Sequence, residues 1–330
     1  MAIFTNNITD NSGVLGNPAD MALAKEVFSG LVLEAFERKN IGLNLVSVMT
    51  IENGSSSTFP VVAQAPDTDV SAYVVGDDVS TSAIPVKERV INITQPQYHA
   101  LSISKLEEKI LNFEVRSKLA KQMGEALATK IDKQVFAEVL TASQTSGTIG
   151  GVVMQPDGSE VNNDVIDSGA TAEEKGDAIF ATIFEADTIM DEKDVSGEKI
   201  CVLTKANFNN LVQSAKGINK DYTSGSNGGV DSGQIVEIAG IKITWSNHLP
   251  VDTAVLGDWD NDAGTADTGK KLQGLIFTDE CVGVVKLMDI MTDIDPLPTK
   301  IRQDLIKSFY WLGMGVLKPA ASCAICGGNA

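Results

Sequence analysis

The chain has few of the residues from which most catalytic sites are built. It contains only two histidines and four cysteines among 330 residues, and aromatic residues make up 5%. Four cysteines in a chain of this length do not form a disulfide framework, so synthesis in a reducing cytoplasm is expected. The longest strongly apolar stretch without a charge, residues 308–317, is too short to span a bilayer. The polar N-terminus lacks a secretory signal pattern, and no membrane association is expected.

Basic residues are also in deficit. The chain has 44 acidic and 26 basic residues, which gives a net charge of −18. A protein that binds nucleic acid by neutralising phosphates is usually basic, so this composition excludes a free-standing nucleic-acid binder. Acidic copies also repel one another, and any assembly is expected to tighten as salt screens the charges. Residues 157–199 hold many of the acids, and we interpret them as a helix over 173–192 with a solvated face.

Two patterns resemble ligand-binding loops without completing them. Residues 264–271 approach a phosphate-binding P-loop, but the last position is Lys where Ser or Thr would ligate magnesium. Asp258, Asp260 and Asp262 match the first ligands of a calcium loop, but Gly269 stands where a bidentate Glu is required. A solvated turn is therefore the better interpretation of this segment.

The spacing of the cysteines in the sequence does not by itself supply the ligands of a metal site. Cys323 and Cys326 have metal-ligand spacing, but zinc needs four ligands. A site would require the fold to bring Cys201 and Cys281 to the same place. Small buried or tail thiols are the simpler interpretation.

The two histidines, His99 and His248, are expected in turns or interfaces. The sequence does not exclude a Ser/His/Asp triad, but no G-x-S-x-G motif marks a nucleophile elbow. The sequence therefore predicts no catalytic, cofactor-binding or metal-binding residues, and no cofactor.

The most regular feature of the chain is a long helix predicted over residues 113–141. No proline interrupts it, strong helix formers dominate, and it makes a rod of roughly 43 Å. Apolar residues recur at every fourth position from Val115 to Val139, and each such step drifts by about 40° around the axis. The helix is expected to bury different sides at its two ends, unlike a coiled-coil seam. Gly124 is expected to mark a close backbone approach.

A long polar segment, residues 50–95, precedes this helix. Alternation in Val86, Val90 and Ile91 favours strands, and we predict a two-stranded excursion with a polar tip. The segment has too few apolar residues to form a core of its own, and a two-stranded ribbon is only marginally stable alone. It is expected to lie on another surface. A chain that completes its core on neighbouring copies is an assembly subunit rather than an enzyme.

The remaining segments mix helices and strands, so the predicted class is α+β. Helices are expected over residues 20–38 and 206–214. Strands are expected over residues 199–203, 234–238, 241–245, 275–277, 283–289 and 300–317.

Several short motifs are distributed from about residue 25 to residue 322. They include Val27-Phe28-Ser29-Gly30, Asn53-Gly54-Ser55, Phe59-Pro60-Val61, Val115-Arg116-Ser117, Ala239-Gly240-Ile241, Val282-Gly283-Val284 and Gly313-Met314-Gly315. In their order and spacing, these motifs resemble the major capsid proteins of short-tailed, podovirus-type double-stranded DNA bacteriophages.

This resemblance implies the tailed-phage major capsid protein fold and a division of the chain into its parts. These parts are an N-terminal arm with a short helix (1–49), the E-loop hairpin (50–95), a peripheral domain with the spine helix (96–141 and 283–322), an axial domain (142–282) and a tail (323–330).

The resemblance also implies a function. Such proteins assemble as hexamers and pentamers into an icosahedral shell that encloses double-stranded DNA without sequence-specific binding, with a scaffolding protein and a portal as partners. The expected location is the virion, after assembly in the bacterial host cytoplasm. Inter-subunit contacts are assigned to the E-loop residues Phe59, Val61, Tyr73, Asp77 and Asp78. The alternatives are an encapsulin-type nanocompartment and a metal- or nucleotide-dependent enzyme.

Overall fold

The computed structural model divides the chain into two compact units. The first comprises Met1–Lys39, Pro96–Ala128 and Asp289–Tyr310, and the second comprises Asn40–Gln95, Thr129–Met288 and Trp311–Ala330. The structure describes residues 18–63, 70, 76, 83–93, 96–104, 114–169, 171–214, 237–250, 271–297 and 303–327.

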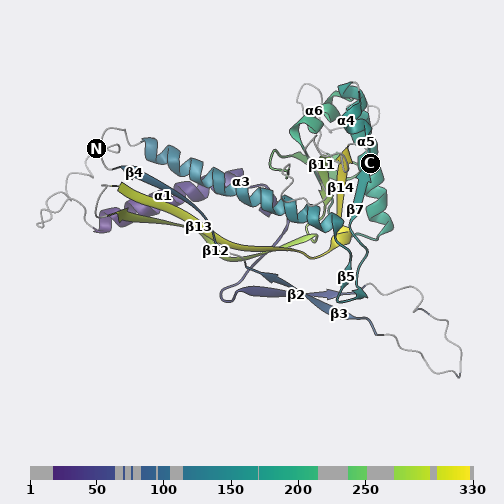
Figure 1. Ribbon diagram of the computed structural model, residues 1–330, viewed down its shortest axis with the longest axis horizontal. Helices are drawn as coiled ribbons and strands as arrows, with labels where there is room; N and C mark the ends of the chain where they lie inside the picture. The colour runs from purple at the N-terminus through teal and green to yellow at the C-terminus, as the bar shows by residue number, and fades with distance from the viewer. Residues whose placement is uncertain are drawn as a thin grey trace, which may run out of the picture. The chain divides into compact units, whose positions relative to one another are not determined.

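In the first unit, helices pack on one face of a sheet (Figure 1). Strand β4 (Gln97–Ser104) runs antiparallel to β13 (Gln303–Val316), and β12 (Val282–Leu297) lies on the other side of β13. Helix α1 (Pro18–Lys39) and the beginning of α3 (Glu114–Gln144) supply the covering layer. The buried core of this unit consists of Phe28, Val32, Ala120, Met123 and Ile306.

The two helices of the first unit approach each other at Gly124. A Cβ atom at this position would lie 2.4 Å from the carbonyl oxygen of Val32 and 2.9 Å from the Cβ of Ala35. Only glycine allows the two backbones to come this close. The close approach predicted for Gly124 is confirmed.

Helix α3 extends three residues beyond the predicted end and contributes residues to both units. Its buried side chains include Met123, Leu127, Ile131, Val135 and Val139, each four positions after the last. Because a four-residue step drifts by about 40°, the buried side turns around the axis along the helix. The predicted drift of the apolar side is therefore confirmed.

The second unit is built around a six-stranded sheet with the order β7-β14-β11-β8-β10-β9. Its strands are β7 (Ser159–Asn162), β14 (Ser322–Gly327), β11 (Lys271–Phe277), β8 (Ile200–Leu203), β10 (Ile241–Trp245) and β9 (Glu237–Ile238). The predicted strands at 199–203, 241–245 and 275–277 are confirmed. Strand β11 is antiparallel to both of its neighbours, so Ile276 lies between Cys201 and Cys323.

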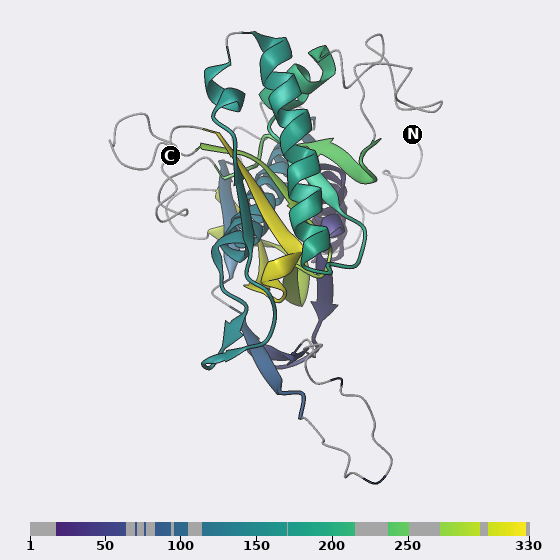
Figure 2. The same ribbon diagram turned by 90° about the vertical axis from the view of Figure 1, so that its right-hand side faces the viewer.

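Helices α4 (Val165–Ser168), α5 (Ala172–Glu192) and α6 (Lys205–Gln213) accompany this sheet. Helix α5 packs against β7 and β14, and Figure 2 shows it beside the yellow strand β14. A capping box starts α5, because the Thr171 hydroxyl accepts from the Glu174 N–H and the Glu174 carboxylate accepts from the Thr171 N–H. The helices predicted over 173–192 and 206–214 are thus confirmed.

The expectation that residues 323–330 form a tail is wrong for most of that segment. Ser322–Gly327 form β14, which pairs in parallel with β7 and antiparallel with β11 and is buried along its whole length. The apolar residues Cys323, Ala324, Ile325 and Cys326 fill the middle of the sheet. Both partner strands are remote in sequence, so no local pattern reveals this pairing.

The second unit also holds the segment that follows α1. A short 3-10 helix, η1 (Gly42–Leu45), leads to β1 (Ser47–Thr50), which pairs in parallel with the beginning of β12. Two hairpins follow along the chain: β2 (Ser56–Val62) with β3 (Val86–Asn92), and β5 (Thr148–Ile149) with β6 (Val152–Val153). The predicted two-stranded excursion is confirmed in these described strands.

Candidate functional site

The β2–β3 hairpin presents two chemically different faces. The strands are antiparallel, with Ser56 opposite Asn92 and Val62 opposite Val86. Because side chains alternate between the faces of a strand, every second residue of each strand points the same way. One face is directed toward the rest of the second unit and the other toward solvent.

The inner face of the hairpin has a small core. Val61 is 6% exposed, and it forms a cluster with Ala63 and with Met154, which follows β6. Ile149 and Val152 of the β5–β6 hairpin pack against this cluster. The excursion thus has no core of its own, as expected, and lies on another surface at this end. That surface is not a neighbouring copy but the β5–β6 hairpin of the same chain, about ninety residues later.

The outer face of the hairpin is exposed along its whole length. Its members are Ser56, Thr58, Pro60, Val62, Val86, Glu88, Val90 and Asn92. Three of them are valines that are more than half exposed: Val62 at 57%, Val86 at 59% and Val90 at 55%. Val62 and Val86 stand directly opposite each other, and Val90 lies opposite Thr58 on the same face. Exposed apolar residues gathered on one face of a sheet are typical of an interaction surface. We call these three valines the outer valines.

Glycines let the hairpin approach the long strands of the same unit. A Cβ at Gly313 would lie 2.6 Å from the carbonyl oxygen of Asn92, and a Cβ at Gly315 would lie 3.1 Å from Cγ1 of Ile91. At Gly283, a Cβ would lie 3.0 Å from Cδ1 of Ile91. These glycines belong to the motifs quoted above for the capsid resemblance. Because they have no side chains, β3 can pack closely against β12 and β13.

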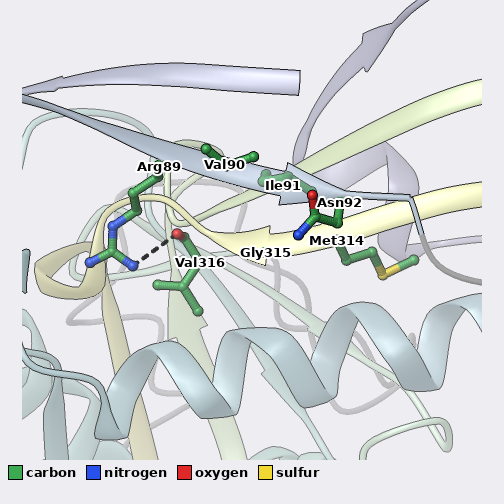
Figure 3. Close-up of a pocket in the computed structure, with 7 residues that line it drawn as sticks. All are labelled: Arg89, Val90, Ile91, Asn92, Met314, Gly315 and Val316. Carbon is green, nitrogen blue, oxygen red and sulfur yellow. Dashed lines mark hydrogen bonds between the residues drawn. The ribbon is translucent and has the colours of Figure 1, made fainter. Parts of the chain in front are cut away.

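An open pocket of about 420 Å³ lies where β3 packs against β13 (Figure 3). It is lined by residues 89–92 of β3 and by Met314, Gly315 and Val316 of β13. Arg89 donates from Nη1 to the carbonyl oxygen of Val316 at 3.1 Å, and its Nε is buried without a partner. Desolvation lowers the pKa of the Arg89 guanidinium from its usual value.

The five predicted inter-subunit residues fall in two groups. Phe59 is half-buried and Val61 is buried, and both lie on the inner face of β2. Tyr73, Asp77 and Asp78 lie outside the residues that the structure describes. Sequence reasoning did not select Arg89 or the outer valines, although the alternation of Val86 and Val90 places them on one face.

His248 has a partner that the sequence did not reveal. Its Nδ1 lies 2.8 Å from Oδ2 of Asp132, a fully buried residue of α3. Asp132 also accepts hydrogen bonds from the backbone N–H groups of Ile41 and Gly42, the latter at 2.8 Å. The carboxylate thus joins three segments of the second unit. The Ser246 hydroxyl accepts from the backbone N–H of His248, so the contact does not form a catalytic triad.

The four cysteines are all buried and form no disulfide. Burial raises the pKa of the Cys201 thiol above its usual range and those of Cys281 and Cys323 to about 12. Such thiols stay protonated and are poor nucleophiles. Within the described ranges, no group of three or more His, Cys, Asp or Glu side chains is arranged to hold a metal ion.

The loop that suggested a P-loop or a calcium site, residues 251–270, lies outside the described residues. Lys271 is described: it begins β11 and forms an ion pair with Asp167 at 2.9 Å. Among the residues with described placement, no helix is long and apolar enough to cross a membrane.

Comparison with known proteins gives a consistent result. The profile of the Gp10A-like major capsid protein family matches residues 63–326. The chain is 26% identical over 350 residues to the major capsid protein of Enterobacteria phage T3, and the match covers 96% of this chain and 95% of that protein. The capsid structure of cyanophage P-SCSP1u has a TM-score of 0.70 at 28% identity and covers 88% of this chain and 89% of that one. The mature capsid of bacteriophage PhiM1 shares the fold, with a TM-score of 0.68 at 17% identity and 88% coverage of both chains.

Proposed function

Because the chain belongs to the Gp10A-like major capsid protein family, we propose that the β2–β3 hairpin is its E-loop. The chain is a phage capsid protein with the tailed-phage fold, and it is a component of the virion. In this role the hairpin lies on a neighbouring copy in the shell. The exposed outer valines carry the proposal, since three apolar side chains on one solvent-facing strand pair gain free energy when another surface covers them.

The hairpin contact acts through repetition. A modest contact that recurs in every subunit stabilises a closed shell, because each copy is held by several neighbours at once. We propose that the copies close into hexamers and pentamers, as expected for heterologous contacts that form rings. In this proposal, residues 96–141 and 283–322 form the peripheral domain and residues 142–282 the axial domain.

We further propose that the shell encloses double-stranded DNA and assembles with a scaffolding protein and a portal. The net charge of −18 supports a wall that does not bind the DNA tightly, because like charges repel. The protein then has a structural role and no enzymatic one. The family match favours this function over the encapsulin-type and enzyme alternatives.

The first test is the state of the purified protein. It is expected to sediment as capsomers, rings or shells, which negative-stain microscopy identifies directly. The assembled fraction is expected to rise with salt, because the Debye length falls from about 10 Å at 0.1 M to about 3 Å at 1 M and repulsion weakens. A protein that remains monomeric at millimolar concentration in high salt would contradict the proposal.

A further inference from the structure

The Arg89 guanidinium is a cation, and some of its N–H donors have no hydrogen-bond acceptor among the described residues. Toward the part of the chain that the structure describes, one of its five N–H donors is used, in the 3.1 Å hydrogen bond to the Val316 carbonyl oxygen. The Nε–H is buried and has no acceptor, and within the described part of the chain no carboxylate forms an ion pair with the guanidinium. In Figure 3, the second terminal nitrogen points away from Val316.

Such an environment is unfavourable for a lone guanidinium. Arginine keeps its charge even where burial disfavours it, because its pKa is far above neutrality. A partly desolvated charge is stabilised when an opposite charge approaches and its remaining donors find acceptors. The planar fork of N–H groups matches one ligand type best, a carboxylate that accepts two parallel hydrogen bonds.

The pocket beside Arg89 has room for that ligand. Its volume of about 420 Å³ is many times that of one water molecule, which occupies about 30 Å³ in the liquid. Gly315 contributes no side chain to the wall, and Met314 contributes a flexible apolar one. A side chain that enters there places a carboxylate at the guanidinium and its methylene groups against Met314.

We infer that this pocket receives an Asp or Glu side chain of a second copy of the chain. The inference rests on the proposed shell function and names one of its contacts. Carboxylates are the charged groups that another copy presents most often, since acids outnumber bases by 44 to 26. Val90, one of the outer valines, follows Arg89 in β3 and also lines the pocket. The two side chains lie on opposite faces of the strand, so a copy that covers the outer valines must also reach around β3 to contact Arg89. The contact offsets part of the repulsion between acidic copies.

Three variants test the inference. Arg89→Gln removes the charge and the fork, and Arg89→Lys keeps the charge alone. Lys87→Gln is the matched control, because Lys87 is an exposed cation two residues earlier on the same strand and the same face. The readouts are the protein concentration at half assembly, measured by sedimentation at 0.1 M salt, and the melting temperature of the unassembled subunit.

Arg89→Gln is expected to raise the half-assembly concentration about tenfold or more, which corresponds to the loss of one charge-assisted contact per copy. Arg89→Lys is expected to lie between Arg89→Gln and the wild type, and Lys87→Gln within about twofold of the wild type. Both Arg89 variants lose or weaken the hydrogen bond to Val316, so the melting temperature of the unassembled subunit is expected to fall by a few degrees, whereas that of Lys87→Gln is expected to match the wild type.

Two results would overturn the inference. One is an unchanged half-assembly concentration for Arg89→Gln while the wild type forms shells. The other is a fall in the melting temperature of the unassembled Arg89→Gln subunit much larger than the loss of the one hydrogen bond to Val316 explains, which would mean that Arg89 acts mainly within its own chain. If the wild type itself does not assemble, the proposed function fails instead, so the two failures are distinguishable.

Discussion

Replacing all three outer valines, Val62, Val86 and Val90, by aspartate is expected to abolish shell formation and to leave a folded, soluble subunit. The side chains are more than half exposed in the single chain, so the buried core of the subunit is unchanged. The hairpin itself is weakened by about 1 kcal/mol, because the new carboxylates at positions 62 and 86 stand directly opposite each other. In the shell, the same positions are expected to be covered, and an uncompensated buried carboxylate is strongly unfavourable. Sedimentation and microscopy measure the assembly, and circular dichroism measures the fold.

Two controls distinguish the effect of the added charge from the effect of its position on the hairpin. Threonine at the same three positions keeps the shape of valine without adding charge, and it is expected to weaken assembly without abolishing it. Val165→Asp places a carboxylate on an exposed valine of α4, 46% exposed, and is expected to assemble as the wild type does. Normal shells from the triple aspartate variant would contradict the E-loop role of the hairpin.

Replacing Asp132 by alanine is expected to lower the free energy of unfolding by about 3–5 kcal/mol, the usual loss when one partner of a buried pair is removed. The variant leaves the backbone N–H groups of Ile41 and Gly42 and the Nδ1 of His248 without their acceptor. Buried donors that lose an acceptor and cannot reach water are the physical reason. Urea unfolding of the unassembled subunit, followed by circular dichroism, measures this change.

The neighbouring residue provides the control for Asp132. Lys133 is exposed on the same helix, and Lys133→Ala is expected to change the stability by less than about 0.5 kcal/mol. Asp132→Asn keeps an acceptor oxygen and should fall between the alanine variant and the wild type. A loss below about 1 kcal/mol for Asp132→Ala would show that the three joined segments are held by other contacts.

Local patterns in the sequence were sufficient for the longer helices. The four-residue spacing that predicts the turning apolar side of α3 also gives its buried residues, from Met123 to Val139. Gly124 is recognisable because a glycine inside a strong helix pattern needs a packing reason. The apolar spacing of α5 is likewise local, and it predicts the helix before any tertiary contact is known.

The contacts that build the candidate site are not local, and the sequence did not reveal them. Asp132 and His248 are separated by 116 positions, and Arg89 and Val316 by 227. The core of the hairpin depends on Met154, which directly follows another hairpin. Alternation shows that Val86 and Val90 share a face. Which face is covered depends on the close contact of Ile91 with Gly283 and Gly315, and that contact exists only in the folded chain.

The central claim is that a second copy covers the outer face of the hairpin in the shell. The chain offers a direct measurement, because its four native cysteines are buried and a single cysteine introduced by Val90→Cys is the accessible thiol. The rate at which a maleimide labels this thiol can be compared between unassembled subunits and closed shells, with the wild type as background. The account predicts fast labelling in the subunit and strong protection in the shell. Equal labelling rates in both states would contradict it.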